Sequence, residues 1–437
     1  MTVSPRLRLA IVGSGIGGLT LAVGLSKLGL DEALEIDIYE AATKLSQVGA
    51  GITVWPRAWD ILKRLDLEHP LSERSPPRQE MLEGKQVLGF SYRKSDQSKG
   101  AQIVDVKLPG GPRAFHRADI QDVLINNTSS AARFHFSYRL VKYTKTSDGI
   151  ELLFANGRQV TCDLLIGADG VNSAVRKCFL EDGNGDMKHS RPQWSGTNVY
   201  RCLIDAEDIK KDAPNHPGLH SPTVYCGKNK HIVVYPILQG RYINTIQFIS
   251  DPSKAGTILE GPASVNFSQD DVASIYTGWE DDVQHIVKHL KRPSKWAIQT
   301  VGPLEKYACE GVILLGDAAH AMPPHLANGA AQAIEDAYIL ANLLAKGLQE
   351  GHHRPNLWKI SSAYNSDRQP FGNFVVDAAQ QQGRRYEFST RGFDGIVEGD
   401  FISPYELTQL GRSIQEGWEW TWKTSVDEHL ERALGSM

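Results

Sequence analysis

The chain has 437 residues and a formal net charge of −4, with charges of both signs dispersed along it, so no electrostatic feature favours nucleic acid or an anionic membrane as a partner. Its length exceeds one ordinary hydrophobic core, which favours two domains or one elaborated domain. No stretch reaches the ~20 apolar residues of a membrane-spanning helix, and five scattered cysteines without a CxxC pair favour a reducing, cytoplasmic compartment.

The stretch from Leu7 to Glu40, LRLAIVGSGIGGLTLAVGLSKLGLDEALEIDIYE, is typical of a strand, a glycine-rich turn, a helix and a second strand. Gly13 permits the tight turn, Gly15 lets the backbone approach a pyrophosphate, and Gly18 lets the helix pack closely on the strand. Glu40 is placed to bind a ribose hydroxyl, which favours FAD or NAD over NADP. A purely structural turn is the alternative. The glycines also argue against a secretory signal peptide.

Residues 41–113 interrupt this pattern. The turn at Val48-Gly49-Ala50-Gly51-Ile52 could bring the backbone close to a flat ring, and Arg57 to Leu65 reads as a short amphipathic helix. The polar segment that follows contains strand-like fragments at 86–92 and 103–108. It is therefore expected to form a hairpin excursion.

The α/β pattern returns with a helix expected from Phe115 to Leu124. Three short antiparallel strands are expected at 139–145, 150–155 and 159–162. The next apolar strand ends in Asp169-Gly170, at the position where open α/β sheets bind ligands. An aspartate that caps a helix is the alternative interpretation of Asp169.

From Trp194 to Trp296 the pattern becomes rich in strands, which predicts a second, sheet-based domain. In a strand from His231 to Tyr235, the period of two places His231, Val233 and Tyr235 on one face. One apolar surface would then carry two hydrogen-bonding side chains. A histidine in the core or at its rim is the alternative.

A second strand that ends in an acid runs from Gly311 to Asp317, and a proline-rich loop then leads into a long helix expected at 330–346. The unpaired N–H groups and partial positive charge at the start of that helix suit an anionic ring or a carbonyl oxygen. Residues 353–437 are expected to form helices, with the tryptophans of 418–422 packed onto the core.

Three motifs occur in order along the chain: Gly13-Ser14-Gly15-Ile16-Gly17-Gly18, Gly167-Ala168-Asp169-Gly170 and Gly316-Asp317-Ala318-Ala319-His320. This order resembles the single-component FAD-dependent aromatic hydroxylases, and within them the salicylate hydroxylase-like branch. The resemblance covers nearly the whole chain, and the Arg-Arg-Tyr-Glu-Phe and Trp-x-Trp elements near its end resemble fungal members.

The resemblance implies an α/β fold with a Rossmann-like FAD-binding domain built on a parallel sheet, a substrate domain with a mainly antiparallel sheet, and C-terminal helices. The FAD-binding domain is expected at 1–76, 114–185 and 296–390. The substrate domain is expected at 186–295, with an excursion toward it at 77–113. The C-terminal helices are expected at 391–437.

The resemblance also implies noncovalent FAD and the residues that bind it. The ADP half would meet Gly13, Gly15, Ile16, Gly18 and Glu40. Arg117 would lie over the cofactor, Ala50 beside its ring, and Asp317 at the ribityl or pyrophosphate part. Asp169 and Gly170 would serve FAD and, transiently, the nicotinamide donor. Gly329 and Ala330 would begin the helix that faces the flavin pyrimidine.

The activity implied by the resemblance is hydroxylation of a small phenolic or aromatic-acid substrate by a monomer or homodimer that needs no metal. NADH or NADPH reduces FAD, O2 adds to give a C4a-hydroperoxide, and an activated phenol attacks it. His231 and Tyr235 of an HxxxYP segment would face the ring, with His325 as a third candidate. Arg201 would pair with a substrate carboxylate or phenolate, or hold the sheet to the FAD domain.

One departure affects the substrate. Leu326-Ala327-Asn328-Gly329 stands where many relatives have Gly-Gln-Gly, and it is closer to the nicotinate-hydroxylating and dearomatising relatives. Plain, decarboxylative and dearomatising hydroxylation therefore stay open. The alternative functions are a FAD-dependent epoxidase, a flavin oxidoreductase that inserts no oxygen, and a non-enzymatic flavin-binding scaffold.

Overall fold

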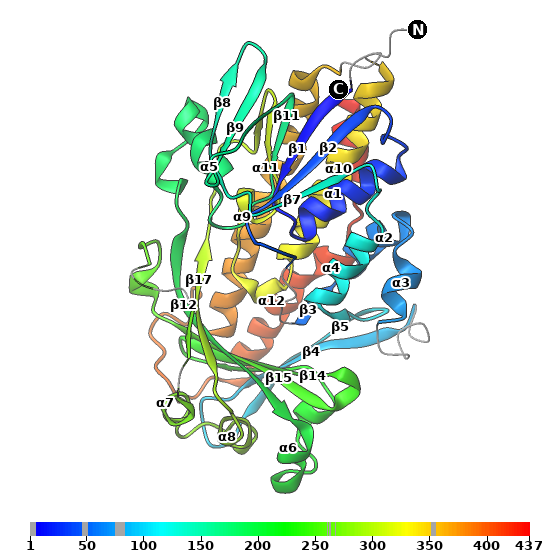
Figure 1. Cartoon of the computed structure of the whole chain (residues 1–437). Helices are drawn as coiled ribbons and strands as arrows, with labels where there is room; N and C mark the ends of the chain where they lie inside the picture. Colours follow the sequence, from blue (N-terminus) through cyan, green and yellow to red (C-terminus); the bar gives the residue numbers. More distant parts are fainter. Residues whose placement is uncertain are drawn as a thin grey trace.

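A computed structural model of the chain describes residues 6–45, 51–74, 84–259, 261, 264–266, 268–350 and 355–437. Two large sheets organise the molecule: a mainly parallel sheet lies at one end, a larger antiparallel sheet lies at the other, and long helices run beside them (Figure 1). This arrangement confirms the predicted α/β class with its C-terminal helices.

The first sheet has six strands, in the order β18 (Ala308–Cys309), β19 (Val312–Leu314), β11 (Leu164–Gly167), β1 (Leu7–Val12), β2 (Leu34–Glu40) and β7 (Arg133–Phe136). All neighbours are parallel except β18 and β19. The apolar run of β1 suits its central place, because a parallel strand is covered on both faces.

The helices of this half are α1 (Ile16–Lys27), α2 (Pro56–Arg64), α3 (Glu68–Ser72), α4 (Arg117–Asn126), α5 (Ala174–Phe179), α9 (Asp317–His320) and α10 (Gly329–Glu350). Helices α1 and α10 pack closely, since a Cβ at Gly24 would lie only 3.2 Å from the Cβ of Ala341. The predicted amphipathic helix is confirmed as α2, and the long helix before the C-terminal segment as α10.

One predicted helix starts in the wrong place. Residues Arg113–His116 form strand β6, which pairs antiparallel with β3 (Gly51–Val54), and α4 begins only at Arg117. Phe115 is paired with Ile52 across this ladder and is buried, so the backbone of this segment finds its hydrogen bonds across the strands rather than within a helix.

The second sheet has eight strands, in the order β16 (Ser264–Asn266), β17 (Ser294–Thr300), β12 (Gln193–Asp205), β15 (Tyr242–Ser250), β14 (Lys230–Ile237), β13 (Thr223–Gly227), β4 (Gln86–Lys94) and β5 (Ala101–Pro109). Its neighbours are antiparallel except β13 and β4. The hairpin of β4 and β5 is the expected excursion. The exact domain boundaries stay a prediction.

The period of two divides β14 between the two faces of this sheet. Ile232 and Val234 are fully buried in a cluster with α6 (Ala206–Asp212), α7 (Gln269–Ser274) and α8 (Asp281–Lys288), three helices that the strand pattern did not predict. His231, Val233 and Tyr235 face the other side, as expected.

The C-terminal helices are α11 (Leu357–Tyr386), α12 (Pro404–Lys423) and α13 (Asp427–Gly435). Helix α12 packs on β5, and Trp418 lies buried with its ring 4.6 Å from that of Trp55. Core packing is thus confirmed for Trp418. Strands β8 (Leu140–Thr146), β9 (Gly149–Phe154) and β10 (Gln159–Cys162) form the expected small sheet.

The described helices include none that is long and apolar enough to cross a membrane. All five cysteines are free.

Candidate active site

A cavity of about 400 Å³ lies where the two large sheets meet, and most predicted site residues line it. Its walls come from the antiparallel sheet, from the segments that follow β1, β11 and β19, and from α11 and α12. The predicted residues on these walls are Gly15, Ile16, Arg117, Gly170, Arg201, His231, Tyr235, Asp317, His325, Gly329 and Ala330. Ala50 lies outside the described residues, although its neighbour Gly51 lines the cavity.

The glycine-rich turn has the form that a diphosphate requires. Gly13 has φ of +108°, and a Cβ there would lie 2.2 Å from the carbonyl oxygen of Ala168. At Gly15, by contrast, a Cβ would meet no described heavy atom within 4 Å. The backbone at the start of α1 therefore borders open space at a helix N-terminus, the kind of place where backbone N–H groups bind phosphate.

Gly18 acts differently from Gly15. A Cβ at Gly18 would lie 2.2 Å from the carbonyl oxygen of Gly13 and 3.1 Å from Ile11 Cγ2. Gly18 lines neither of the two cavities of this region, so it serves the packing of helix on strand. A contact of Gly18 with the cofactor stays a prediction.

A second cavity of about 250 Å³ adjoins the first, since Gly15, Ala168 and Gly170 line both. Glu40 lies on its wall, where one carboxylate oxygen accepts hydrogen bonds from the Ser14 N–H at 3.1 Å and hydroxyl at 2.6 Å. The cavity beside Glu40 leaves room for a ribose, whose binding by this carboxylate stays a prediction.

Asp169 is held as a helix cap. Its carboxylate accepts hydrogen bonds from the hydroxyl of Ser173 at 2.5 Å and from the backbone N–H groups of Ala174 and Val175 at 2.8 and 3.1 Å. The N-cap residue of α5 is Ser173, and Asp169 adds to the cap by accepting from the first two N–H groups of the helix. Asp169 also lines the second cavity, so it fixes the turn that borders the ADP region.

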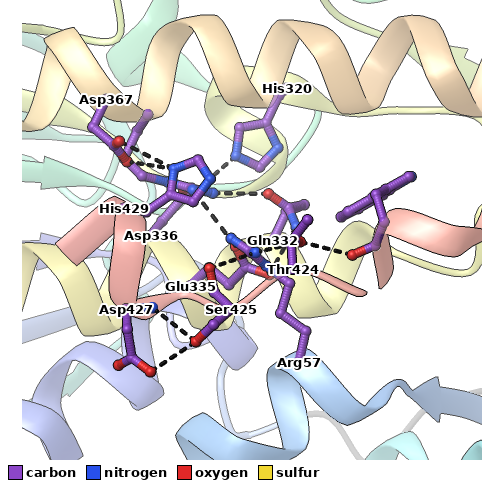
Figure 2. Close-up of polar contacts among 12 residues, drawn as sticks. Arg57, His320, Gln332, Glu335, Asp336, Asp367, Thr424, Ser425, Asp427 and His429 are labelled. Carbon is purple, nitrogen blue, oxygen red and sulfur yellow. Dashed lines mark hydrogen bonds and ion pairs between the residues drawn. The ribbon is translucent and has the colours of Figure 1, made fainter. Parts of the chain in front are cut away.

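A buried ionic network surrounds the carboxylates of Glu335 and Asp336 on α10 (Figure 2). Arg57 of α2 donates to both carboxylate oxygens of Glu335, at 2.9 and 3.0 Å. Asp336 accepts from the side chains of Arg368 and His320 at 2.7 and 2.6 Å and from the N–H of Gly316 at 2.9 Å. The network therefore fixes the start of the Gly316-Asp317 segment at the cavity.

Arg57→Met should lower the free energy of unfolding by roughly 3–5 kcal/mol, because it strips a buried carboxylate of its main partner. Both side chains of the Arg57–Glu335 pair are at most 2% exposed. Lys63→Met is the matched control on the same helix; its ion pair with Asp60 is partly exposed and should contribute about 1 kcal/mol or less. Urea unfolding measures both. Equal losses would contradict this account.

His231 and His325 face each other across one wall of the cavity. Their ring centroids are 5.3 Å apart, and the His231 ring stacks on Phe248 at 4.2 Å. Helix α11 makes room for the second histidine, since a Cβ at Gly383 would lie 2.4 Å from His325 Cδ2. Tyr386 of the same helix lies edge-on to His231 at 5.4 Å.

Burial sets the charge of these groups. It lowers the pKa of His231 to about 3, and burial with the neighbouring His231 lowers the pKa of His325 to about 3 as well. Both rings are therefore neutral near pH 7. Among the described residues, His231 Nε2 and His325 Nδ1 have no hydrogen-bond partner. These nitrogens are suited to a polar substrate group.

Arg201 places a cation on the cavity wall. Burial lowers the pKa of its guanidinium, Tyr235 opposes this shift, and Arg117 adds to it. An arginine nevertheless stays charged in proteins. Its Nε has no hydrogen-bond partner within the described part of the chain. The cavity thus attracts an anionic ligand.

The sequence did not single out Glu387, Tyr386 or Trp418 as site residues. Glu387 Oε1 lies 2.9 Å from His231 Nδ1, while Tyr386 and Trp418 line the cavity. The indole Nε1–H of Trp418 donates to the hydroxyl of Tyr92 at 2.8 Å. The same Tyr92 hydroxyl lies 3.0 Å from the hydroxyl of Tyr386. The available signals were the Arg-Arg-Tyr-Glu-Phe and Trp-x-Trp elements, whose partners lie far away in the sequence.

Comparisons with known proteins agree with this site. A family model described as FAD binding domain matches residues 6–379. The chain is 32% identical over 441 residues to a salicylate hydroxylase of Pseudomonas putida, covering 98% of this chain and 94% of that one. It is 31% identical over 442 residues to the 6-methylsalicylate 1-monooxygenase atA of Aspergillus terreus, covering 99% and 93%.

The fold comparison gives the same family. A solved salicylate hydroxylase substrate complex matches with a TM-score of 0.83 at 26% identity, covering 98% of both chains. The resemblance drawn from the three motifs is thereby confirmed, as is FAD as the cofactor. The chain belongs to the family of FAD-dependent aromatic monooxygenases that contains salicylate hydroxylase.

Proposed function

We propose that this enzyme hydroxylates a small phenolic aromatic acid, with NADH or NADPH as the reductant and O2 as the oxidant. The observation that carries the proposal is the wall of the larger cavity, where two neutral histidines and a tyrosine stand near an arginine whose Nε has no partner among the described residues. The named substrates of the two relatives, salicylate and 6-methylsalicylate, are phenols that carry a carboxylate.

In this proposal, different residues bind FAD, bind the substrate and accept the phenolic proton. The turn at Gly15 would hold the FAD diphosphate, and the start of α10 would face the flavin pyrimidine. Bound FAD supplies the electron transfer and the activation of O2. Arg201 would pair with the substrate carboxylate, His231 or His325 would accept the phenolic proton, and Tyr235 would orient the ring. The apolar side chains of Phe248 and Trp418 would keep water out.

The direct test is turnover under ¹⁸O2 with salicylate, 6-methylsalicylate and 3-hydroxybenzoate, each with NADH and with NADPH. Incorporation of one ¹⁸O atom into a hydroxylated product is the expected result. Release of CO2 and loss of aromatic absorbance separate decarboxylative and dearomatising hydroxylation from plain hydroxylation. If ligands accelerate flavin reduction without ¹⁸O in any product, the enzyme does not insert oxygen and the proposal is wrong.

Arg201→Met should raise KM for a carboxylated phenol by roughly 10- to 100-fold, because a charge-assisted hydrogen bond contributes about 1.5–3 kcal/mol. The KM for a phenol without a carboxylate should change little, since it makes no such pair. Arg412→Met on the exposed face of α12 is the matched control. If KM rises equally for both substrates, Arg201 supports the fold of the cavity rather than the carboxylate.

A further inference from the structure

Glu387, at the C-terminal end of α11, contacts His231, which lines the larger cavity. Its Oε1 lies 2.9 Å from His231 Nδ1 and accepts a hydrogen bond from the hydroxyl of Ser250 at 3.0 Å. The His231 side chain is 0% exposed and that of Glu387 is 8% exposed. A buried carboxyl is thus held against the side of the imidazole that carries Nδ1.

The proton on this carboxyl decides which nitrogen of His231 carries hydrogen. When Glu387 is a carboxylate, Nδ1–H donates to it, and Nε2 keeps a free electron pair. When Glu387 is a carboxylic acid, its O–H donates to Nδ1, and Nε2 carries the hydrogen. Nε2 has no partner within the described chain, and His231 lines the cavity, so the two states offer a ligand an acceptor or a donor.

We propose that Glu387 is a positioning residue that sets the tautomer of His231 and takes up the proton released by a bound phenol. This inference rests on the proposed function. The phenolic O–H bond breaks as an N–H bond forms at Nε2, and the N–H bond at Nδ1 breaks as an O–H bond forms on Glu387. A phenol and a carboxylate become a phenolate and a carboxylic acid, so protons and charge balance.

The pKa values of Glu387 and His231 favour this proton transfer. Burial raises the pKa of Glu387 to about 7, so its carboxyl can bind and release a proton near neutral pH. The pKa of His231, lowered to about 3 by burial, disfavours a resting imidazolium, so the proton passes through the ring rather than staying on it. Ser250 is partly exposed, and its hydroxyl donates a hydrogen bond to the carboxyl.

The other titratable or charged groups around the pair are His325, Tyr386, Tyr276, Cys226 and Lys228. Burial, with His231, lowers the pKa of His325, and burial raises the pKa values of Tyr386, Tyr276 and Cys226, so these four are neutral near pH 7. Lys228 donates to the carbonyl oxygens of Phe388 and Phe393. Glu387 differs from these four groups, because burial raises the pKa of its carboxyl to about 7.

The first test observes the tautomer directly in FAD-loaded enzyme labelled with [¹⁵N]histidine, where His231→Gln identifies the signal. In the wild type, the ring should change from Nε2–H to Nδ1–H as the pH rises through about 7. Glu387→Gln should abolish this change, whereas Glu387→Asp should keep it. A single tautomer at all pH values in the wild type would overturn the inference, whatever the enzyme's substrate.

The second test follows product formation. Wild-type hydroxylation should rise as pH increases through about 7, because the carboxylate is the accepting form. Glu387→Gln should slow hydroxylation on the order of 10²-fold and remove that rise, while Glu387→Asp restores part of both. Unchanged rate and pH profile in Glu387→Gln would overturn the inference.

A matched control separates this role from stability. Asp367→Asn removes the carboxylate of another buried pair, in which Asp367 Oδ1 lies 3.0 Å from His429 Nδ1, away from the cavity. It should lower the melting temperature but keep the pH profile. If the wild type changes tautomer but oxidises no phenol, the proposed function fails while the control of the tautomer by Glu387 stands.

Discussion

Gly15→Val should give a folded protein that no longer binds FAD. A Cβ at this position meets no described heavy atom within 4 Å, so the substitution fills only the space expected for the diphosphate. Its backbone, at φ −71° and ψ −179°, is extended and accepts valine without strain. The visible absorbance of the purified protein measures flavin content, and circular dichroism measures folding. Loss of flavin should abolish monooxygenase activity.

Two comparisons sharpen this test. Gly395→Val, on an exposed loop where a Cβ also meets no described atom, should retain full flavin content. Gly18→Val should unfold the turn as well, because its side chain would collide with the carbonyl of Gly13. Stoichiometric FAD in folded Gly15→Val would show that the diphosphate lies elsewhere.

His231→Gln and Tyr235→Phe should each slow hydroxylation by roughly 10²–10⁴-fold, the usual contribution of a positioned acid–base group. Both side chains line the larger cavity, whereas neither lines the second cavity beside Glu40. FAD content should therefore stay intact. With the phenol poorly ionised or misplaced, NAD(P)H oxidation should continue while H2O2 replaces product. Coupled assays of NAD(P)H, H2O2 and product measure the loss.

The matched control is His189→Gln. His189 is also buried, and burial lowers its pKa too, but it lines neither cavity. This variant should keep the ratio of product to NAD(P)H consumed. Normal turnover and coupling in both His231→Gln and Tyr235→Phe would assign these residues to the rim of the core, and the phenolic proton would then leave through another group.

The parts of the site that depend on local spacing could be predicted from the sequence. Gly13, Gly15 and Glu40 belong to one short strand–helix–strand unit. The spacing of residues within such a unit predicts the role of each of them. The shared face of His231 and Tyr235 follows from the strand period alone. These features require no knowledge of distant contacts.

The rest depends on tertiary packing. Glu387 meets His231 only because α11 ends against β14, and the two residues are 156 positions apart. The role of Asp169 was ambiguous because an acid after a buried strand can cap a helix or face a ligand, and here the carboxylate caps α5. The segment before Arg117 forms β6 because β3 pairs with it, which the local pattern does not encode.

The buried network behind α10 also constrains the order of assembly during synthesis. Arg57 donates to the Thr424 hydroxyl and the Ser425 carbonyl at 2.8 Å, and Asp367 pairs with His429 of α13 (Figure 2). These C-terminal partners leave the ribosome long after both sheets and α10. The network around α10 is therefore completed only after residues 424–429 have been synthesised.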